Sequence, residues 1–286
     1  MRIIAGKYRS RKLLSPRDAE TTRPIPDRVK ESLFSLLRGH FEGATVLDCF
    51  AGTGSIGLEA LSRGASRIVF VEKDRRAAEL LERNIDLLGA SDDCEVVHGD
   101  ALGPATLARC PKPVDLVFFD PPYPLILDPH GWDRVSRQFS RIIDNLADTG
   151  FAMLRTPWPF RHVTVIDKEG NVVPIGDPRN PFDERGRVRK DLPPPSGKKF
   201  KGTHDQLHDD DRREWIYAGG DDIDVDAIQR ETDLEMEAYQ KVLDRTPGSG
   251  FTLERREVDL RFDNAQGPET HEYASQAVHL YMRKKT

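Results

Sequence analysis

Short apolar runs alternate with longer amphipathic segments along the first half of the chain. The runs predict strands at 45–48, 67–71, 95–97, 116–119 and 151–154, and the segments predict helices at 55–63, 75–88 and 133–146. Gly64 and Gly89 follow two of these helices and mark their expected ends. Strands that alternate with helices of this size are typical of βαβ units. We therefore predict an α/β fold with a doubly wound, mostly parallel sheet.

Four of the predicted strands are followed by an acid at or near their carboxyl ends: Asp48, Glu72, Asp100 and Asp120. In an open parallel sheet the carboxyl ends of the strands meet at one edge, and ligands bind outside that edge. We therefore expect the four carboxylates to lie close together and to form part of a binding site.

A glycine-rich loop follows the first of these strands. Residues 52–57 read G-x-G-x-x-G, a pattern that is also found in dinucleotide-binding domains, so the motif alone does not decide the ligand. Asp48 favours a different ligand, because a carboxylate beside the loop repels a pyrophosphate and attracts a cation. S-adenosylmethionine carries an ammonium and a sulfonium and no phosphate. We predict that it is held by Asp48, Gly52, Thr53, Gly54, Glu72, Asp100 and Ala101, with Glu72 on the ribose hydroxyls and Asp100 on the adenine amine.

The tetrapeptide Asp120-Pro121-Pro122-Tyr123 follows the apolar run 116–119. The two prolines stiffen the loop and leave its carbonyls free to accept hydrogen bonds. An acid, free carbonyls and an aromatic ring suit a planar group that carries an NH2, such as a nucleobase. An ordinary turn at the end of a strand, with a satisfied aspartate, is the structural alternative.

Taken together, these motifs resemble those of class I methyltransferases, and more narrowly those of the RsmD family. Residues 48–54 look like methyltransferase motif I, and 120–123 look like the amino-group motif. The segments 2–13, 22–34 and 57–65 narrow the match to RsmD. The resemblance covers about residues 1–156 and resumes weakly at 273–281. It implies a Rossmann-like methyltransferase fold and methyl transfer to the N2 amine of a guanine in small-subunit (16S) ribosomal RNA, with S-adenosylhomocysteine as the other product. It also implies that Asp120, Pro121, Pro122 and Tyr123 are catalytic.

Charge is segregated along the chain, although its formal net charge is −5. The first 40 residues are basic, whereas residues 205–244 are dominated by acids. A basic arm on an acidic protein suggests a polyanionic partner, and a solvated surface strip is the plainer alternative. We predict that Arg9, Arg11, Arg23 and Arg28 contact RNA. For Arg23 and Arg28, contact with the donor's carboxylate or salt bridges at a helix start are alternatives.

Composition also predicts the organisation of the chain. We expect four segments: a basic arm and first helix (1–42), a methyltransferase core (43–168), a Pro/Gly-rich and then acidic insertion (169–250), and closing strands (251–286).

The three cysteines are odd in number and lack a CxxC pair, which argues against a disulfide framework and a zinc site, and we expect no metal cofactor. Cys49 is expected to be a packed thiol rather than a nucleophile. With no apolar run of membrane-spanning length and no secretory signal, we expect a cytoplasmic protein. We also expect a monomer.

Other functions remain open from the sequence. The same chemistry can act on adenine N6 in DNA or on a glutamine amide in a protein, because the proline motif suits any planar amine. A noncatalytic RNA-binding or ribosome-assembly factor on the same fold is a third possibility, and a nicotinamide dehydrogenase is a distant fourth. Naked RNA, an assembled subunit and an assembly intermediate are all candidate substrates.

Overall fold

The computed structural model describes residues 1–15, 25–174, 177, 179–180, 237, 240–241, 244 and 250–285. The chain divides into two compact units. We call residues 1–123, 134–158 and 260–286 the core unit, and residues 124–133 and 159–259 the hairpin unit. Arg23 and most of the predicted insertion, including its acidic stretch up to residue 236, lie outside the described residues.

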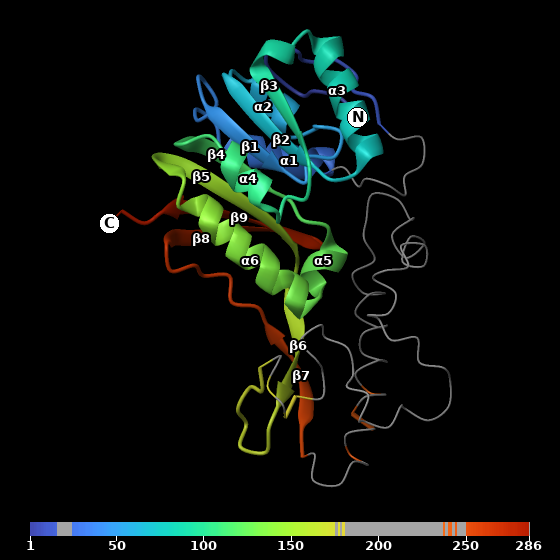
Figure 1. Ribbon diagram of the computed structural model, residues 1–286, viewed down its shortest axis with the longest axis vertical. Helices are drawn as coiled ribbons and strands as arrows, with labels where there is room; N and C mark the ends of the chain where they lie inside the picture. Colours follow the sequence, from blue (N-terminus) through green and yellow to red (C-terminus); the bar gives the residue numbers. More distant parts are fainter. Residues whose placement is uncertain are drawn as a thin grey trace. The chain divides into compact units, whose positions relative to one another are not determined.

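The core unit is built on a seven-stranded sheet (Figure 1). Its order is β3 (Cys94–His98), β2 (Arg67–Glu72), β1 (Thr45–Cys49), β4 (Val114–Phe119), β5 (Leu146–Pro157), β9 (Gln276–Arg283) and β8 (Ala265–Tyr273). The first five strands in this order run parallel to one another, and β9 and β8 are antiparallel to their neighbours. The predicted mostly parallel α/β sheet is confirmed, and β8 and β9 close it.

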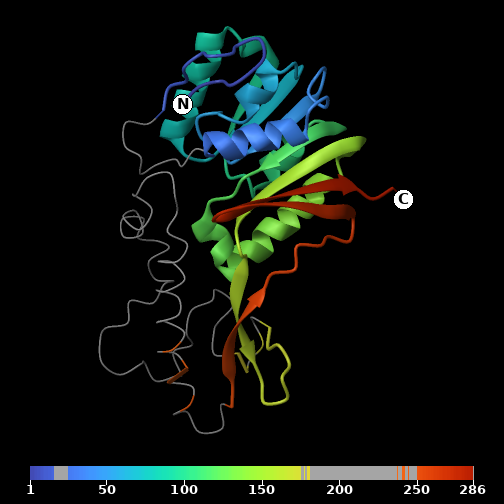
Figure 2. The ribbon, with the colours of Figure 1, turned by 180° about the vertical axis from the view of Figure 1, so that it is seen from behind.

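Helices cover both faces of this sheet because alternate strand residues point to opposite sides. Helices α1 (Asp27–Leu36), α2 (Gly57–Ser62) and α3 (Arg75–Leu88) share one buried cluster with Val46, Phe70 and Phe118. On the other face, Phe119 contacts Phe139 of α6 (Pro129–Ile143), whose residues from 134 onward belong to the core unit. Figures 1 and 2 show α4 (Pro104–Arg109) and α6 on the face opposite α1.

The helix ends follow local sequence signals. In α3 the side chain of Asp74 accepts a hydrogen bond from the Ala77 N–H at 2.7 Å, and Gly89 ends the helix in the left-handed conformation with φ of 62°. The predicted bounds 75–88 are therefore confirmed. Helix α6 begins four residues before the predicted start at 133, and the prediction omitted the short helices α4 and α5 (Tyr123–Leu127).

The hairpin unit contains a separate antiparallel pair, β6 (Arg161–Ile166) with β7 (Thr252–Glu257). Val165, Val173 and Leu253 form its small apolar cluster. Strand β6 was absent from the prediction. Strand β7 lies within the predicted closing strands (251–286), but it pairs with β6 in a separate sheet and does not join the seven-stranded sheet. The four predicted segments differ in outline from the two units, and their roles stay predictions.

Candidate functional site

The structure brings the four predicted acids to one edge of the sheet. Asp48 lies at the end of β1, beside β4, and Asp120 follows β4 directly. Glu72 ends β2 opposite His98 of β3, two residues before Asp100. The negative charges of Asp120 and Glu72 both raise the pKa of Asp48, after the larger effect of burial, so the groups are within electrostatic reach. The four acids thus lie at one edge of the sheet, as expected, and their part in a binding site stays a prediction.

Asp48 is the most deeply buried of these acids, at 1% exposure. Its Oδ2 accepts a hydrogen bond from the Gly57 N–H at 2.8 Å. Burial raises its pKa to about 8, against the opposing effect of that hydrogen bond. In the donor-free protein Asp48 therefore favours the protonated form at neutral pH. A cation bound beside it would favour the carboxylate.

Glycine is required at two positions here, one in the loop between β1 and α2 and one at the first residue of α2. Gly54 has φ of +86°, and a Cβ there would lie 2.4 Å from Leu81 Cδ1 of α3. A Cβ on Gly57 would lie 2.3 Å from the Phe70 ring and 2.9 Å from Asp48 Oδ2. The backbone lies so close to its neighbours at both positions that only glycine fits there. This close packing holds the loop at the sheet edge.

Glu72 and Asp100 are tied to nearby backbone. Glu72 Oε2 accepts the Gly52 N–H and Oε1 accepts the Asp74 N–H, both at 2.7 Å. Asp100 Oδ1 accepts the Leu102 N–H at 2.9 Å, and its side chain remains 40% exposed. A carboxylate oxygen has more than one lone pair, so both acids can still accept hydrogen bonds from hydroxyls or an amine.

Asp120 is paired with a cation that the sequence analysis did not identify. Arg155 of β5 donates from Nε to Oδ1 at 2.7 Å and from Nη2 to Oδ2 at 2.8 Å. The two side chains are 10% and 11% exposed. Burial opposes the charged form of Arg155, but the Asp120 carboxylate outweighs it and raises the arginine's pKa. Nothing in the sequence indicated this pair, because Arg155 lies 35 residues from Asp120 and directly after the predicted strand 151–154.

Tyr123 is buried in this conformation, at 6% exposure, whereas Pro122 is exposed. The Tyr123 hydroxyl donates to the Thr156 carbonyl at 3.3 Å, and the Arg155 guanidinium lies 5.6 Å from the ring centroid. Stacking of a substrate base on this ring, as the sequence suggested, would need the ring to become more exposed. That role stays a prediction.

A buried histidine supports the same strand. His279 of β9 is hydrogen-bonded through Nε2 to Thr156 Oγ1 at 2.8 Å and through Nδ1 to Thr270 Oγ1 at 2.9 Å. Burial lowers its pKa to about 4, so it is neutral at physiological pH. His279 therefore fixes the strand that carries Arg155 and is no acid–base candidate.

The amino-terminal arm is a docked hairpin. Ile3 and Leu13 are buried, and the Ile3 N–H donates to the Arg11 carbonyl at 3.0 Å. Glu59 of α2, which is fully buried, accepts the Ile4 N–H at 2.7 Å and the Ala5 N–H at 3.0 Å. Its carboxylate also pairs with the buried Lys30 at 3.8 Å and with Arg63 at 2.9 Å. A buried carboxylate with two cations is therefore the anchor of the arm.

This docking leaves the basic side chains of the arm at the surface. Arg2, Lys7, Arg9, Arg11 and Lys12 are all exposed, as is Arg28 on α1. We call this set the basic surface. Of the predicted RNA contacts, Arg9, Arg11 and Arg28 belong to it, and Arg23 lies outside the described residues.

The arm is also joined to the glycine loop through one side chain. Asn84 of α3 is fully buried; its Oδ1 accepts the Leu14 N–H at 2.7 Å. Its Nδ2 donates to the Leu14 carbonyl at 3.1 Å and to the Thr53 carbonyl at 3.0 Å. A single amide thus ties the end of the arm to the loop at the carboxyl edge.

Comparison with known proteins places these motifs in a family. A family model described as "Conserved hypothetical protein 95" matches residues 1–130. Ribosomal RNA small subunit methyltransferase D of Escherichia coli strain K12 is 43% identical over 123 residues, which are 43% of this chain and 60% of the relative. YlbH of Bacillus subtilis is 37% identical over 125 residues, 43% of this chain and 67% of YlbH. The chain belongs to the RsmD family.

The similarity to these RsmD relatives is confined to one part of the chain, which spans about 60% of the length of the Escherichia coli protein. The structure of yhhF from Escherichia coli superposes with a TM-score of 0.53 at 23% identity and covers 99% of this chain and 98% of yhhF. At that identity the likeness supports the fold and nothing finer.

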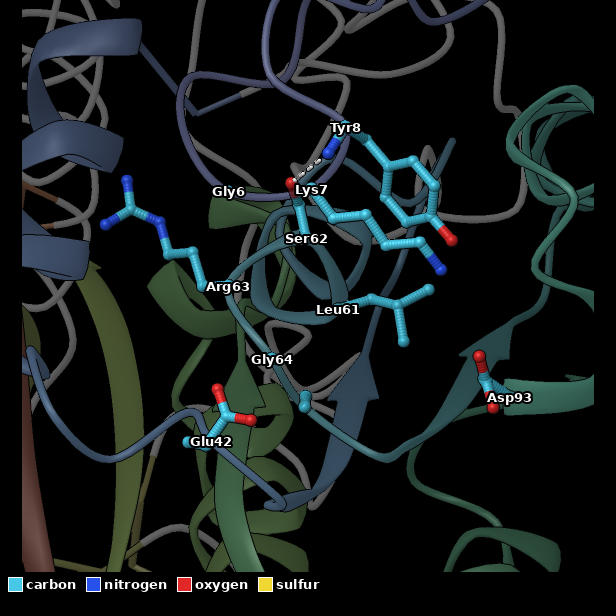
Figure 3. Close-up of a pocket in the computed structure, with 10 residues that line it drawn as sticks. Gly6, Lys7, Tyr8, Glu42, Leu61, Ser62, Arg63, Gly64 and Asp93 are labelled. Atoms are coloured by element: carbon cyan, nitrogen blue, oxygen red, sulfur yellow. Dashed lines mark hydrogen bonds between the residues drawn. The ribbon is translucent and has the colours of Figure 1, made fainter.

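A pocket of about 350 Å³ lies at the opposite, amino edge of the sheet in this RsmD-family chain (Figure 3). It is lined by the arm at Lys7 and Tyr8, by the end of α2, and by Glu42 and Asp93, which precede β1 and β3. Figure 3 shows the hydrogen bond from the Tyr8 N–H to Ser62 Oγ, at 2.9 Å, that holds the arm there. The arm docks at this pocket, which lies at the ends of the strands opposite to the carboxyl edge.

Within the described part of the chain, no three or more His, Cys, Asp or Glu side chains are grouped so that they could hold a metal ion. No helix in that part has both the length and the apolar character of a membrane span. Cys49 is buried, and burial raises the pKa of its thiol well above the ordinary value. A thiol in that state is a poor nucleophile.

Proposed function

We propose that this protein transfers a methyl group from S-adenosylmethionine to the exocyclic N2 amine of a guanine in small-subunit ribosomal RNA. The observation that carries the proposal is the placement of the Asp120-Pro121-Pro122-Tyr123 loop beside Asp48 and the glycine loop, at the ends of the adjacent strands β1 and β4. Membership of the RsmD family supports RNA as the acceptor, because relatives carry the name ribosomal RNA small subunit methyltransferase D.

The residues of the donor half of this edge fit S-adenosylmethionine. Asp48 offers a carboxylate to a cationic group, Glu72 offers acceptors to ribose hydroxyls, and Asp100 with Ala101 faces an adenine amine. The glycine loop brings backbone N–H groups to the same edge without side chains in the way. When bound, the donor supplies a methyl group that its sulfonium has already activated.

The acceptor half is suited to orienting an amine. The N2 lone pair of guanine is delocalised into the ring, so the amine is a weak nucleophile. Asp120 and the Pro121 carbonyl accept hydrogen bonds from its two N–H groups and so direct the nitrogen lone pair toward the methyl group. The proton that the nitrogen loses on methylation is released toward Asp120. Such positioning can supply on the order of several kcal/mol to the rate. The basic surface binds the RNA backbone through its charges.

Asp120→Ala tests the assignment of the amine site. We expect turnover to fall to background, because the amine loses its charged acceptor, while the dissociation constant for S-adenosylmethionine changes little. Calorimetry measures donor binding, and transfer of labelled methyl groups to small-subunit RNA measures turnover. Asp148→Ala, an exposed carboxylate at the far end of β5 paired with Arg283, is the matched control and should leave both quantities unchanged. Substantial activity in Asp120→Ala would contradict the assignment.

A further inference from the structure

We infer that Arg155 is a positioning residue for the reaction. It acts by fixing the orientation of the Asp120 carboxylate and the position of the Tyr123 ring. The inference rests on the proposed function and adds to it a residue outside the recognised motifs. It is carried by the geometry of one buried side chain.

The pairing of Arg155 with Asp120 is a two-point contact. Nε and Nη2 of Arg155 donate to the two different carboxylate oxygens, at 2.7 and 2.8 Å. A planar guanidinium bound in this way prevents the carboxylate from rotating. Each oxygen keeps a further lone pair, so the carboxylate can still accept a hydrogen bond from an amine, in a direction that Arg155 determines.

Arg155 is itself held from a third side. Its Nη1 donates to Gln276 Oε1 at 2.9 Å, and Gln276 is the first residue of β9. Strand β9 pairs antiparallel with β5, so the guanidinium is fixed between two adjacent strands. The orientation of Asp120 therefore depends on a residue more than 150 positions later in the chain.

The same guanidinium borders the aromatic residue of the loop. It lies 5.6 Å from the Tyr123 ring centroid, within the range of a cation–π contact. Arg155 thus contacts both the first and the last residue of the Asp-Pro-Pro-Tyr loop, while the two prolines keep the intervening backbone stiff.

A contribution to the stability of the fold is a weak explanation for the buried pair of Arg155 and Asp120. Taking a cation and a carboxylate out of water costs free energy, and buried pairs seldom stabilise a fold more than apolar residues of the same volume do. The pair gives directional control of the single carboxylate at the amine site. That control is what a transfer reaction needs, because misplacement by about 1 Å can cost about 100-fold in rate.

The test compares Arg155→Met and Arg155→Lys with the wild type. We expect kcat to fall about 100-fold in Arg155→Met, as expected for a misplaced reacting group. The KM for RNA and the dissociation constant of S-adenosylmethionine should stay within about threefold, because no binding group is removed. Arg155→Lys restores the charge without the two-point contact and should recover only part of kcat. Arg283→Met, a cation on β9 paired with the exposed Asp148, is the control and should keep wild-type kcat.

A folded Arg155→Met with wild-type kcat overturns the inference, as does a loss confined to KM or donor binding. If Arg155→Met does not fold, because Asp120 is left buried and unpaired, Asp120→Asn is compared with Asp120→Asn/Arg155→Gln. Equal kcat in these two supports action through Asp120, and a further loss of about tenfold or more in the double variant overturns it. Failure of the proposed function is a separate result, because the wild type itself would then transfer no methyl group.

Discussion

Burial decides the properties of several single residues in this molecule. Asp48 and Glu59 are both acids at or below 1% exposure, yet their side chains have different partners. Glu59 forms ion pairs with Lys30 and Arg63, whereas Asp48 has one backbone donor and two acidic neighbours. Glu59 therefore anchors the arm through its ion pairs, and Asp48 remains available to a cationic ligand.

The state of Asp48 leads to a pH-dependence of stability. We expect the free energy of unfolding of the donor-free protein to fall as pH rises from about 4 to about 8. The unfolded side chain titrates near about 3.9, whereas burial raises the pKa of folded Asp48 to about 8. In that window the folded state holds a proton that the unfolded state has lost, and stability declines by up to about 1.4 kcal/mol per pH unit.

Urea unfolding of the wild type and Asp48→Asn across this range measures the effect. The asparagine keeps an acceptor for the Gly57 N–H and cannot ionise, so the difference between the two proteins isolates Asp48. We expect the wild type to lose stability relative to Asp48→Asn as pH rises. Parallel pH profiles would show that Asp48 is not protonated in the folded protein.

Glu59→Gln tests the anchor of the arm. The substitution leaves Lys30 buried without its counter-charge, and we expect a loss of about 3 kcal/mol in the free energy of unfolding. Glu79→Gln is the control, because Glu79 forms an exposed pair with Arg75 on α3 and such pairs contribute about 0 to 1 kcal/mol. Equal unfolding midpoints for the two variants would contradict the role assigned to Glu59.

At the scale of elements, the regular periodicity of the sequence made most of the sheet predictable. The strands β1 to β5 and the helix α3 follow from apolar runs and capping residues, and the four acids follow from the ends of those strands. The side chains that hold these acids and the glycine loop in place could not be predicted from the sequence. Arg155 contacts Asp120 across 35 residues and Gln276 across 121 residues. Asn84 contacts Thr53 across 31 residues and Leu14 across 70 residues, so only tertiary packing brings these groups together.

Asn84 allows a test of how the elements are joined. In Asn84→Ala the Leu14 backbone and the Thr53 carbonyl lose their buried partner. We expect a loss of about 2 to 4 kcal/mol in stability and weaker binding of S-adenosylmethionine, because Thr53 lies in the glycine loop. Denaturation and calorimetry measure the two effects. Asn145→Ala is the control, since its side chain makes one exposed hydrogen bond at the end of α6. Unchanged donor binding would show that the arm and the loop are independent.

At the scale of the whole molecule, the sequence predicted a separation of charge, and the structure places its basic part at the surface of a docked hairpin. We expect Arg9→Ala/Arg11→Ala to weaken RNA binding and to reduce its salt dependence. Each lost phosphate contact on single-stranded RNA should lower the slope of log K against log salt by about 0.7. Binding titrations over a range of salt measure the slope, with Arg283→Ala as control. An unchanged slope would place the RNA surface elsewhere.

The central claim is methyl transfer to guanine N2, and analysis of the modified nucleoside tests it most directly. The purified protein is incubated with labelled S-adenosylmethionine and either naked small-subunit RNA or undermethylated small subunits, and the RNA is then digested to nucleosides. We predict label in N2-methylguanosine from at least one of the two substrates. Label in another nucleoside, or tight donor binding with no label in either RNA, would contradict the claim.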